Sequence, residues 1–386
     1  MMNRCALLLL SLLLASCAVV PPAPVPRAEH LLADQRFAAA SEPVNADDVF
    51  ALSPAMKKYL ATDIAAQVRS KGRAQALVDA LYRKGDLKLE YDAALTRNAA
   101  QAFDARSGNC LSLVIMTAAF AKELGLAIEY RDVFTEETWG RSDDLFYSIG
   151  HVNLSLLRPK VDPGFARNEG ERMTIDFLPP RDLRGLRTRV VGEDTIVAMY
   201  MNNRAVEAFA RGQVDDAYWW ARGAVWRDPQ FLSAYNTLGV IYQRHGDLLL
   251  AEKTLRYVLD AEPENTRAMS NLVAVLNEQN RVAEAGTLKR KLEQLEPNPP
   301  FSYFNRGVAA MREGNVKAAK ELFEKEVDRA AYYHEFHFWL ALAYVRLGEV
   351  EPARKHLTMA MENSTTRKDH DLYAAKLDRI RFATQQ

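Results

Sequence analysis

Cysteine is scarce in this chain of 386 residues, which contains only three. Cys5 lies in a short apolar stretch at the N-terminus, and Cys17 follows that stretch closely. If the stretch is an export signal that is removed and Cys17 is modified, Cys110 is the one free thiol left. Cysteines of exported proteins usually pair in disulfides. The unpaired Cys110 is therefore either a small buried hydrophobic residue or a reactive nucleophile.

An excess of charge of either sign is also missing. Lys plus Arg and Asp plus Glu number 50 each, which gives a formal net charge of zero. A nucleic-acid-binding domain usually carries a basic field, so no nucleic acid partner is predicted. The content of 48% hydrophobic and 26% charged residues is typical of globular domains, and the length allows two of about 100–200 residues each.

The apolar stretch at residues 6–14 is interrupted only by Ser11 and is too short to span a bilayer, which takes about 20 residues. It has the proportions of a signal peptide. It ends in Leu14-Ala15-Ser16-Cys17, which resembles a bacterial lipobox, although an ordinary signal with a nearby cysteine is an alternative.

The lipobox resemblance implies a signal peptide at residues 1–16 and a lipid anchor on Cys17. Buried acyl chains contribute about 0.8 kcal/mol per methylene, enough to hold a protein on a membrane without a spanning helix. Ala18, in place of an acidic residue, resembles the sorting pattern of outer-membrane lipoproteins. We therefore expect the periplasmic face of the outer membrane, with residues 17–46 as a proline-rich tether.

The C-terminal half repeats with a period of 34 residues. Alanines recur in register, and a glycine or asparagine recurs at a second phase; the series are Ala217, Ala251, Ala285, Ala319, Ala353 and Gly212, Gly246, Asn280, Gly314, Gly348. Small residues let two helices approach closely, and Gly or Asn suits the positive φ of the turn between them. This period is typical of tetratricopeptide repeats. The sequence predicts an all-α solenoid of five repeats at residues 198–365 and a capping helix at residues 366–386.

Arrays of this kind bind peptides along the concave face, so we expect a protein or peptide partner there. By the family pattern, the face would be lined by Asn202, Asn236, Gln243, Arg244, Phe301, Phe304, Met311, Phe338 and Arg346. The alternative for each aromatic residue is that it belongs to the core between repeats. A cluster on the second helix of the first repeat is too wide to face one neighbour, so part of it should pack on the preceding domain: Tyr218, Trp219, Trp220 and Trp226.

Residues 47–193 form a second predicted domain, which contains Cys110. The turn Ser107-Gly108-Asn109 precedes an apolar stretch that reads as a buried helix ending at Gly125. This places Cys110 at or just inside the helix N-terminus, where free N–H groups and the helix dipole favour a thiolate.

Three strands are predicted after that helix, at residues 127–133, 151–157 and 172–178. In the strand at residues 151–157, side chains alternate between the two faces, so His151 lies on the face opposite the Val and Leu side chains. In the strand at residues 172–178, the same alternation places Asp176 on the face opposite Ile175. The imidazole and the carboxylate could then meet, so that Asp176 orients the ring and the ring activates the sulfur. Taken alone, each is more often a solvated strand residue.

The order Gly-Asn-Cys at a helix start, His at a strand start and Ile-Asp on the next strand resembles the transglutaminase-like superfamily of papain-like thiol enzymes. The resemblance covers residues 87–177 and implies an α+β fold with Cys110 as nucleophile, His151 as general base and acid, and Asp176 as the residue that orients it. Asn153 and Phe177 depart from the family pattern, which commonly has Trp and Pro at these places.

The resemblance implies hydrolysis of an amide bond through a Cys thioester. The alternative is a non-catalytic envelope scaffold that acts through its tetratricopeptide repeats, and a third possibility is transfer of the acyl group to an amine. No cofactor and no metal are predicted, because the acidic residues at positions 136–144 lack the spacing of a calcium loop. That segment is expected to be a loop at the rim of the cleft.

Overall fold

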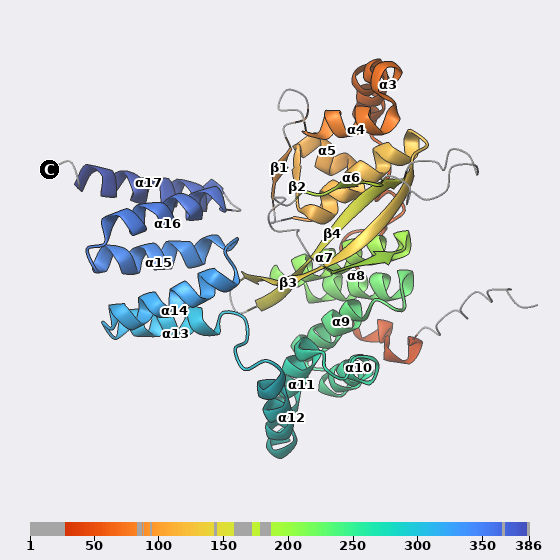
Figure 1. Cartoon of the computed structure of the whole chain (residues 1–386). Coiled ribbons are helices and arrows are strands. Elements are labelled where there is room, and N and C mark those ends of the chain that lie inside the picture. The colour runs from red at the N-terminus through yellow and green to blue at the C-terminus, as the bar shows by residue number, and fades with distance from the viewer. Residues whose placement is uncertain are drawn as a thin grey trace, which may run out of the picture.

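The structure is a computed structural model with a mixed α/β part followed by a helical array, coloured from red to blue along the chain in Figure 1. It describes residues 28–82, 87, 89–92, 95–142, 145–157, 172–177, 187–364 and 367–383. Cys5 and Cys17, and with them the predicted signal and lipid anchor, lie outside the described residues.

The sheet of the first part has four antiparallel strands in the order β5-β4-β3-β6. Their bounds are Ala127–Ser142 for β3, Leu145–Leu157 for β4, Arg172–Ile175 for β5 and Arg187–Val191 for β6. The three predicted strands are present, but β5 ends at Ile175, one residue before Asp176. The strands β3 and β4 form a longer hairpin than expected, with a register irregularity between Val133 and Thr138. The predicted rim loop at positions 136–144 is therefore mostly strand, because cross-strand pairing continues beyond the irregularity as far as Ser142↔Leu145.

Helices pack against this sheet, and α6 (Cys110–Glu123) is the central one. Every side chain at residues 110–121 is buried, so α6 has apolar neighbours all round and no solvent face there. The other elements here are the short η1 Glu29–Leu31 and η2 Asp34–Arg36, α2 Pro54–Tyr59, η3 Leu60–Ile64, α3 Ala65–Lys71, α4 Arg73–Tyr82, α5 Ala99–Ala105, and the parallel pair β1 Glu90–Tyr91 and β2 Ser107–Gly108.

Five consecutive helical hairpins follow in the described residues, in agreement with the period of 34. They are α7 Glu193–Ala210 with α8 Val214–Arg227, α9 Leu232–His245 with α10 Leu248–Ala261, α11 Thr266–Glu278 with α12 Val282–Leu295, α13 Ser302–Arg312 with α14 Val316–Arg329, and α15 His334–Arg346 with α16 Val350–Glu362. The predicted turn glycines and Asn280 all have positive φ. The last helix, α17 Arg367–Ala383, buries Tyr373 and Leu377 and matches the predicted capping helix.

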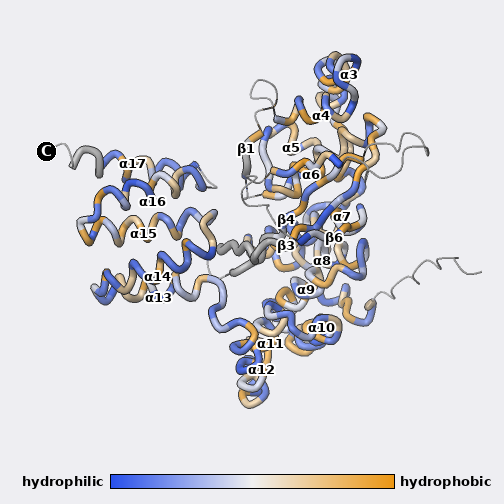
Figure 2. Tube along the Cα trace, in the orientation of Figure 1, coloured by the Kyte–Doolittle hydropathy of each residue, from blue (hydrophilic) through white to orange (hydrophobic). Residues whose placement is uncertain are grey.

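Small residues stand where the two helices of a hairpin touch. A Cβ added to Gly307 would lie 2.5 Å from the Phe323 ring, and one added to Gly239 would lie 2.7 Å from Leu255. At Gly239 and Gly307 there is therefore no room for a side chain, because it would push the paired helices apart. Figure 2 shows hydrophobic and hydrophilic residues interspersed along the repeat helices, as one-sided burial requires.

The hydrophobic core is divided between the third and fourth hairpins. One cluster runs without a break from the α/β part through α12, whereas α13–α15 have a cluster of their own. Residues 296–301 connect the two, and Phe301 adopts φ +63° at the start of α13. The sequence period thus stays regular across this connection, although the hydrophobic core is interrupted there.

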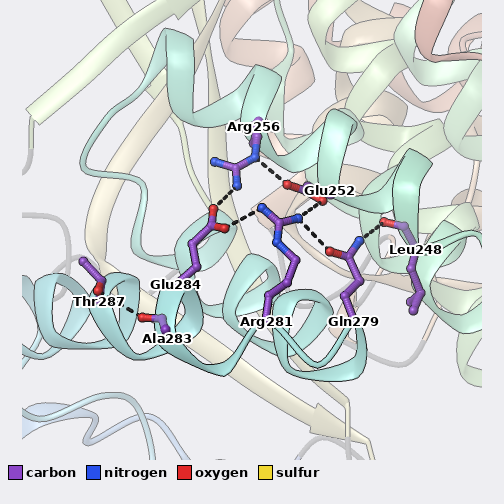
Figure 3. A network of polar contacts seen from close by, with 8 residues as sticks. All are labelled: Leu248, Glu252, Arg256, Gln279, Arg281, Ala283, Glu284 and Thr287. Carbon is purple, nitrogen blue, oxygen red and sulfur yellow. Dashed lines mark hydrogen bonds and ion pairs between the residues drawn. The ribbon is translucent and has the colours of Figure 1, made fainter.

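An ion-pair network joins α10 to the third repeat (Figure 3). Glu252 accepts hydrogen bonds from Arg256 and Arg281, at 2.8 and 2.6 Å, and Glu284 pairs with the same two arginines. These bonds lower the pKa of Glu252 to about 2 against the opposing effect of its burial. Both arginines and Glu284 are more than 40% exposed, so the network adds little to stability.

The N-terminal segment, residues 28–46, packs on the first two repeats. The ring of Phe37 stacks on Tyr218 with centroids 3.9 Å apart. The Tyr218 hydroxyl donates to Asp34 Oδ1 at 2.5 Å, and Trp219 Nε1 donates to a backbone carbonyl of the segment at 2.6 Å. Tyr218 and Trp219 of the aromatic cluster on α8 therefore pack on this segment, and not on the domain at residues 47–193 as predicted. Trp220 instead lies against Tyr200 of α7, with ring centroids 6.2 Å apart.

Residues 28–46 belong to the stretch that the sequence assigned to an extended tether. Leu31, Ala33 and Phe37 are buried, and Tyr242 donates a hydrogen bond to the Leu31 carbonyl at 2.6 Å. The described part of the predicted tether is thus fixed to the solenoid. The proline-rich residues 21–26 lie outside the described residues.

Candidate active site

The start of α6 positions Cys110 as the sequence predicted. Asn109 is the N-cap, and its side-chain oxygen accepts from Ser112 N at 2.9 Å and from Ser112 Oγ at 2.8 Å. Gly108 is required before it, because a Cβ there would come within 2.6 Å of Ser112 Cβ. Cys110 is consequently the first residue of the helix, where the backbone N–H groups of the first turn have no partner within the helix.

His151 and Asp176 meet in the sheet. The register Leu154↔Ile175, extended by one residue, places Asn153 opposite Asp176, with His151 diagonal to it on the same face. His151 Nε2 lies 2.8 Å from Asp176 Oδ1, and their side chains are 4% and 7% exposed. The strand alternation thus brings the two residues into contact as predicted.

Cys110 is the second neighbour that acts on the imidazole. Its Sγ lies 3.6 Å from the carbonyl oxygen of Gly150, the residue before His151. Burial lowers the pKa of His151, but hydrogen bonds to Asp176 and to Cys110 raise it, and the resulting pKa is about 9. Because Nε2 is held by Asp176, Nδ1 is the nitrogen left for the sulfur. At neutral pH the ring is therefore an imidazolium between two groups that can carry negative charge.

Two residues that the sequence did not assign to the site hold Asp176 in place. Asn153 Nδ2 donates to Asp176 Oδ2 at 2.9 Å, so each carboxylate oxygen has its own donor. The Tyr82 hydroxyl donates to the Asp176 carbonyl at 2.7 Å and accepts from its N–H at 3.2 Å. Asn153 lies on the same face of the strand as His151, so the alternation that indicated His151 could have indicated Asn153 as well. Tyr82 lies 94 residues away from Asp176, and no local pattern marks it.

The polar residues predicted to line the repeat groove are on first helices of hairpins, and several are already paired. Asn236 accepts from Asn271 at 3.0 Å, Gln243 donates to Glu278 at 2.5 Å, and Arg346 donates to a backbone carbonyl at 3.2 Å. Arg244 is exposed, and Asn202 is half-buried. These positions remain compatible with a binding face.

The apolar groove residues are mostly core instead. Phe301, Phe304 and Met311 are only 1%, 2% and 5% exposed and belong to the cluster of α13–α15. Phe338 packs against Tyr373 of α17 with ring centroids 5.0 Å apart. The alternative of core between repeats is therefore correct for Phe301 and Phe304, whose rings fill the contact between neighbouring hairpins. Met311 is buried in the same cluster.

Within the described residues, no group of three or more His, Cys, Asp and Glu side chains could hold a metal ion. In the same part of the chain, none of the helices combines the length and the apolar character needed to cross a bilayer.

The helical array matches a known family. Residues 236–299 and 304–365 match the tetratricopeptide repeat model. The C-terminal half is thus built of tetratricopeptide repeats, a class of module that serves protein–protein interaction. The match begins inside α9, so it does not include the first hairpin. No curated protein matches the chain.

Several solved structures are similar to the helical half. MamA from Desulfovibrio magneticus RS-1 is 20% identical with a TM-score of 0.26, covering 45% of this chain and 96% of that one. A thermophilic TPR protein of Thermus thermophilus is 18% identical with a TM-score of 0.29, covering 47% and 98%. The pilF protein of Pseudomonas aeruginosa is 21% identical with a TM-score of 0.28, covering 49% and 97%.

Proposed function

We propose that this protein binds a protein or peptide partner through its repeats and hydrolyses an amide bond at Cys110. In this proposal the N-terminal part is a transglutaminase-like thiol domain. The observation that supports this proposal is that Cys110, His151 and Asp176 lie next to one another in one site. His151 Nε2 lies 2.8 Å from the Asp176 carboxylate, and the pKa of His151 is about 9. Perturbed titratable groups that contact each other in a buried site favour catalysis over a purely structural role.

The chemistry follows from the three side chains. The Cys110 thiolate attacks the carbonyl carbon of the amide, and the His151 imidazolium gives its proton to the leaving amine, which leaves a thioester. His151, now neutral, takes a proton from water; the hydroxide formed attacks the thioester, and the acid and the thiolate are released. Asp176 keeps the ring in place in both steps. The N–H of Cys110 is the candidate donor to the oxyanion.

A non-catalytic scaffold is the second candidate, and two observations favour it. The family match covers the repeats only, which supports an interaction role without chemistry. Cys110 is also only 4% exposed, so a substrate would need a path to the sulfur. In this reading the α/β part has no chemistry of its own, and the repeats carry the function. Transfer of the acyl group to an amine would use the same thioester, and no observation favours it over water.

Reactivity and turnover separate the candidates. We would express the mature chain with Cys17→Ser, so that Cys110 is the only thiol, and measure alkylation by iodoacetamide across pH. The enzyme predicts alkylation near pH 6 that is lost in Cys110→Ala and greatly slowed in His151→Ala, since an ordinary thiol has a pKa of about 8.5. It also predicts that a peptide mixture is cleaved by the parent and not by Cys110→Ala. If Cys110 is alkylated only above pH ~8 and no peptide is cleaved, the enzyme is refuted and the scaffold is the remaining candidate.

Lipid anchoring to the periplasmic face of the outer membrane is a separate proposal, supported by the sequence Leu14-Ala15-Ser16-Cys17 and Ala18. Cell fractionation of the full chain and its Cys17→Ser variant tests it. Release of the variant from the membrane fraction is the expected result. A variant that stays in the membrane fraction would contradict the anchor.

A further inference from the structure

A buried polar cluster connects the first repeat with the start of α6. Thr96, which is 2% exposed, is at its centre. Its backbone N–H donates to Glu207 Oε1 at 2.6 Å. Its Oγ1 lies 2.9 Å from Asn109 Nδ2 and 3.2 Å from Asn203 Nδ2. Glu207 and Asn203 belong to α7, whereas Asn109 is the N-cap of the helix that carries Cys110.

The carboxylate of Glu207 determines the direction of these hydrogen bonds. A carboxylate only accepts, and Glu207 accepts the Thr96 N–H through Oε1. Oγ1 of Thr96 accepts from two amide groups, so its single proton points away from both and toward this carboxylate, whose pKa it lowers. The lone pairs of Oγ1 are then left to accept from the amide of Asn109. Arg204 Nη1, 3.0 Å from Glu207 Oε2, supports the negative charge, whereas burial raises the pKa of Glu207.

This direction matters because the two ends of an asparagine amide have almost the same shape and opposite roles. With Nδ2 toward Thr96, Asn109 presents Oδ1 to Ser112 N, which is the orientation that caps a helix. If the Thr96 proton pointed at Asn109, the amide would turn over and present its NH₂ group to the N–H groups of the first turn. The cap would then be lost at the residue next to Cys110.

We propose that Glu207 of the first repeat is a positioning residue for Cys110: through Thr96 it fixes the amide of Asn109, and the capped first turn of α6 then stabilises the thiolate. This inference rests on the proposed role of the Cys110 thiol. It makes the first hairpin part of the catalytic unit rather than only the first element of the binding array.

Glu207→Gln tests the inference, because glutamine has nearly the same shape but only one accepting end. It cannot accept from both Thr96 and Arg204 as the carboxylate does, so the contact with Thr96 is weakened or reversed. We expect the pH at which half of Cys110 is thiolate, read from the ultraviolet absorbance of the thiolate, to rise by about half a unit, which is about threefold less thiolate at pH 6. Thr96→Val should give the same shift, and Thr96→Ser, which keeps the hydroxyl, should behave as the parent.

Glu193→Gln is the matched control. Glu193 is also on α7 and contacts the α/β part through Lys122 at 2.7 Å and Tyr130 at 3.1 Å, but it is outside the Thr96 cluster. It should leave the thiolate profile unchanged. An equal shift in Glu193→Gln would overturn the inference, because the effect would then come from a general loosening of the interface. The absence of a shift in Glu207→Gln would overturn it as well.

A double-mutant cycle separates this inference from the proposed function. If Glu207 acts through Asn109, the urea midpoints of Glu207→Gln, Asn109→Ala and the double variant are not additive, and the double variant is no less stable than Asn109→Ala. Additive effects overturn the inference whatever the thiol does. A third outcome is that Cys110 of the parent ionises only above pH ~8 while the effects of the cycle are not additive. This outcome refutes the proposed enzyme but supports the positioning of Asn109 by Glu207.

Discussion

The protonation of His151 gives the sharpest prediction, because it depends on a neighbour that one substitution changes. Burial lowers the pKa of His151, while hydrogen bonds to Asp176 and Cys110 raise it, to about 9 from an ordinary 6.5. One pKa unit corresponds to about 1.4 kcal/mol. Protonation of His151 therefore stabilises the folded chain by about 3 kcal/mol at acidic to neutral pH.

The pH dependence has a definite sign. A histidine whose pKa is higher in the folded than in the unfolded chain contributes its full stabilisation below about pH 6.5 and loses it as the pH rises through about 9. Asp176→Asn keeps the shape of the side chain but removes its charge, so the pKa of His151 falls toward 6.5 or lower. The variant should be less stable than the parent by about 2–3 kcal/mol at pH 6 and nearly equal to it at pH 10.

Urea unfolding at the two pH values measures the difference, and the NMR titration of the histidine ring protons, assigned with His151→Gln, measures the pKa itself. Asp132→Asn is the control, because the Asp132 carboxylate pairs with Arg189 at 3.0 Å on the same sheet without touching the site. Its effect should be below about 1 kcal/mol, as for other surface pairs. A penalty for Asp176→Asn that is equal at pH 6 and pH 10, or a His151 that titrates near 6.5 in the parent, would refute the reasoning.

Three further predictions concern the repeats. Gly307→Ala should destabilise the chain by about 1–2 kcal/mol in urea unfolding, since its Cβ would lie 2.5 Å from Phe323; an unchanged midpoint would contradict this. Gly286→Ala, inside α12 with no atom nearer than 3.8 Å, should stabilise it by up to about 1 kcal/mol, and a loss of stability would be unexpected. Burial and the neighbouring His337 lower the pKa of His356 to about 4, so stability should fall as the pH drops from 6.5 to 4, and His356→Gln should weaken that fall; an identical acid profile in thermal melts would count against it.

Local sequence patterns were enough to predict much of the fold. The period of 34 located the helical hairpins because each repeat needs the same small residues at the helix contact and the same turn residue. The start of α6 was predictable because Gly108 and Asn109 satisfy local demands of space and capping. Strand alternation located His151 and Asp176 because side chains of one face share a parity.

The remaining features depend on contacts between distant parts of the chain. Tyr82 reaches Asp176, and Glu207 reaches Thr96, across 94 and 111 residues, and no period or motif connects such pairs. The docking of residues 28–46 was missed because their composition suggested only a tether. Phe301 and Phe304 were assigned to the groove because repeat phase alone does not tell how deeply a side chain is buried.

The ultraviolet absorbance of the Cys110 thiolate tests the central claim most directly, since it needs no reagent to reach a side chain that is 4% exposed. The difference between the mature Cys17→Ser chain and the same chain with Cys110→Ser would be followed from pH 4 to pH 10. An imidazolium at His151 predicts thiolate already at pH 6, and its loss in His151→Gln. Absorbance that appears only above pH ~8, as for an ordinary thiol with a pKa of about 8.5, would contradict the claim.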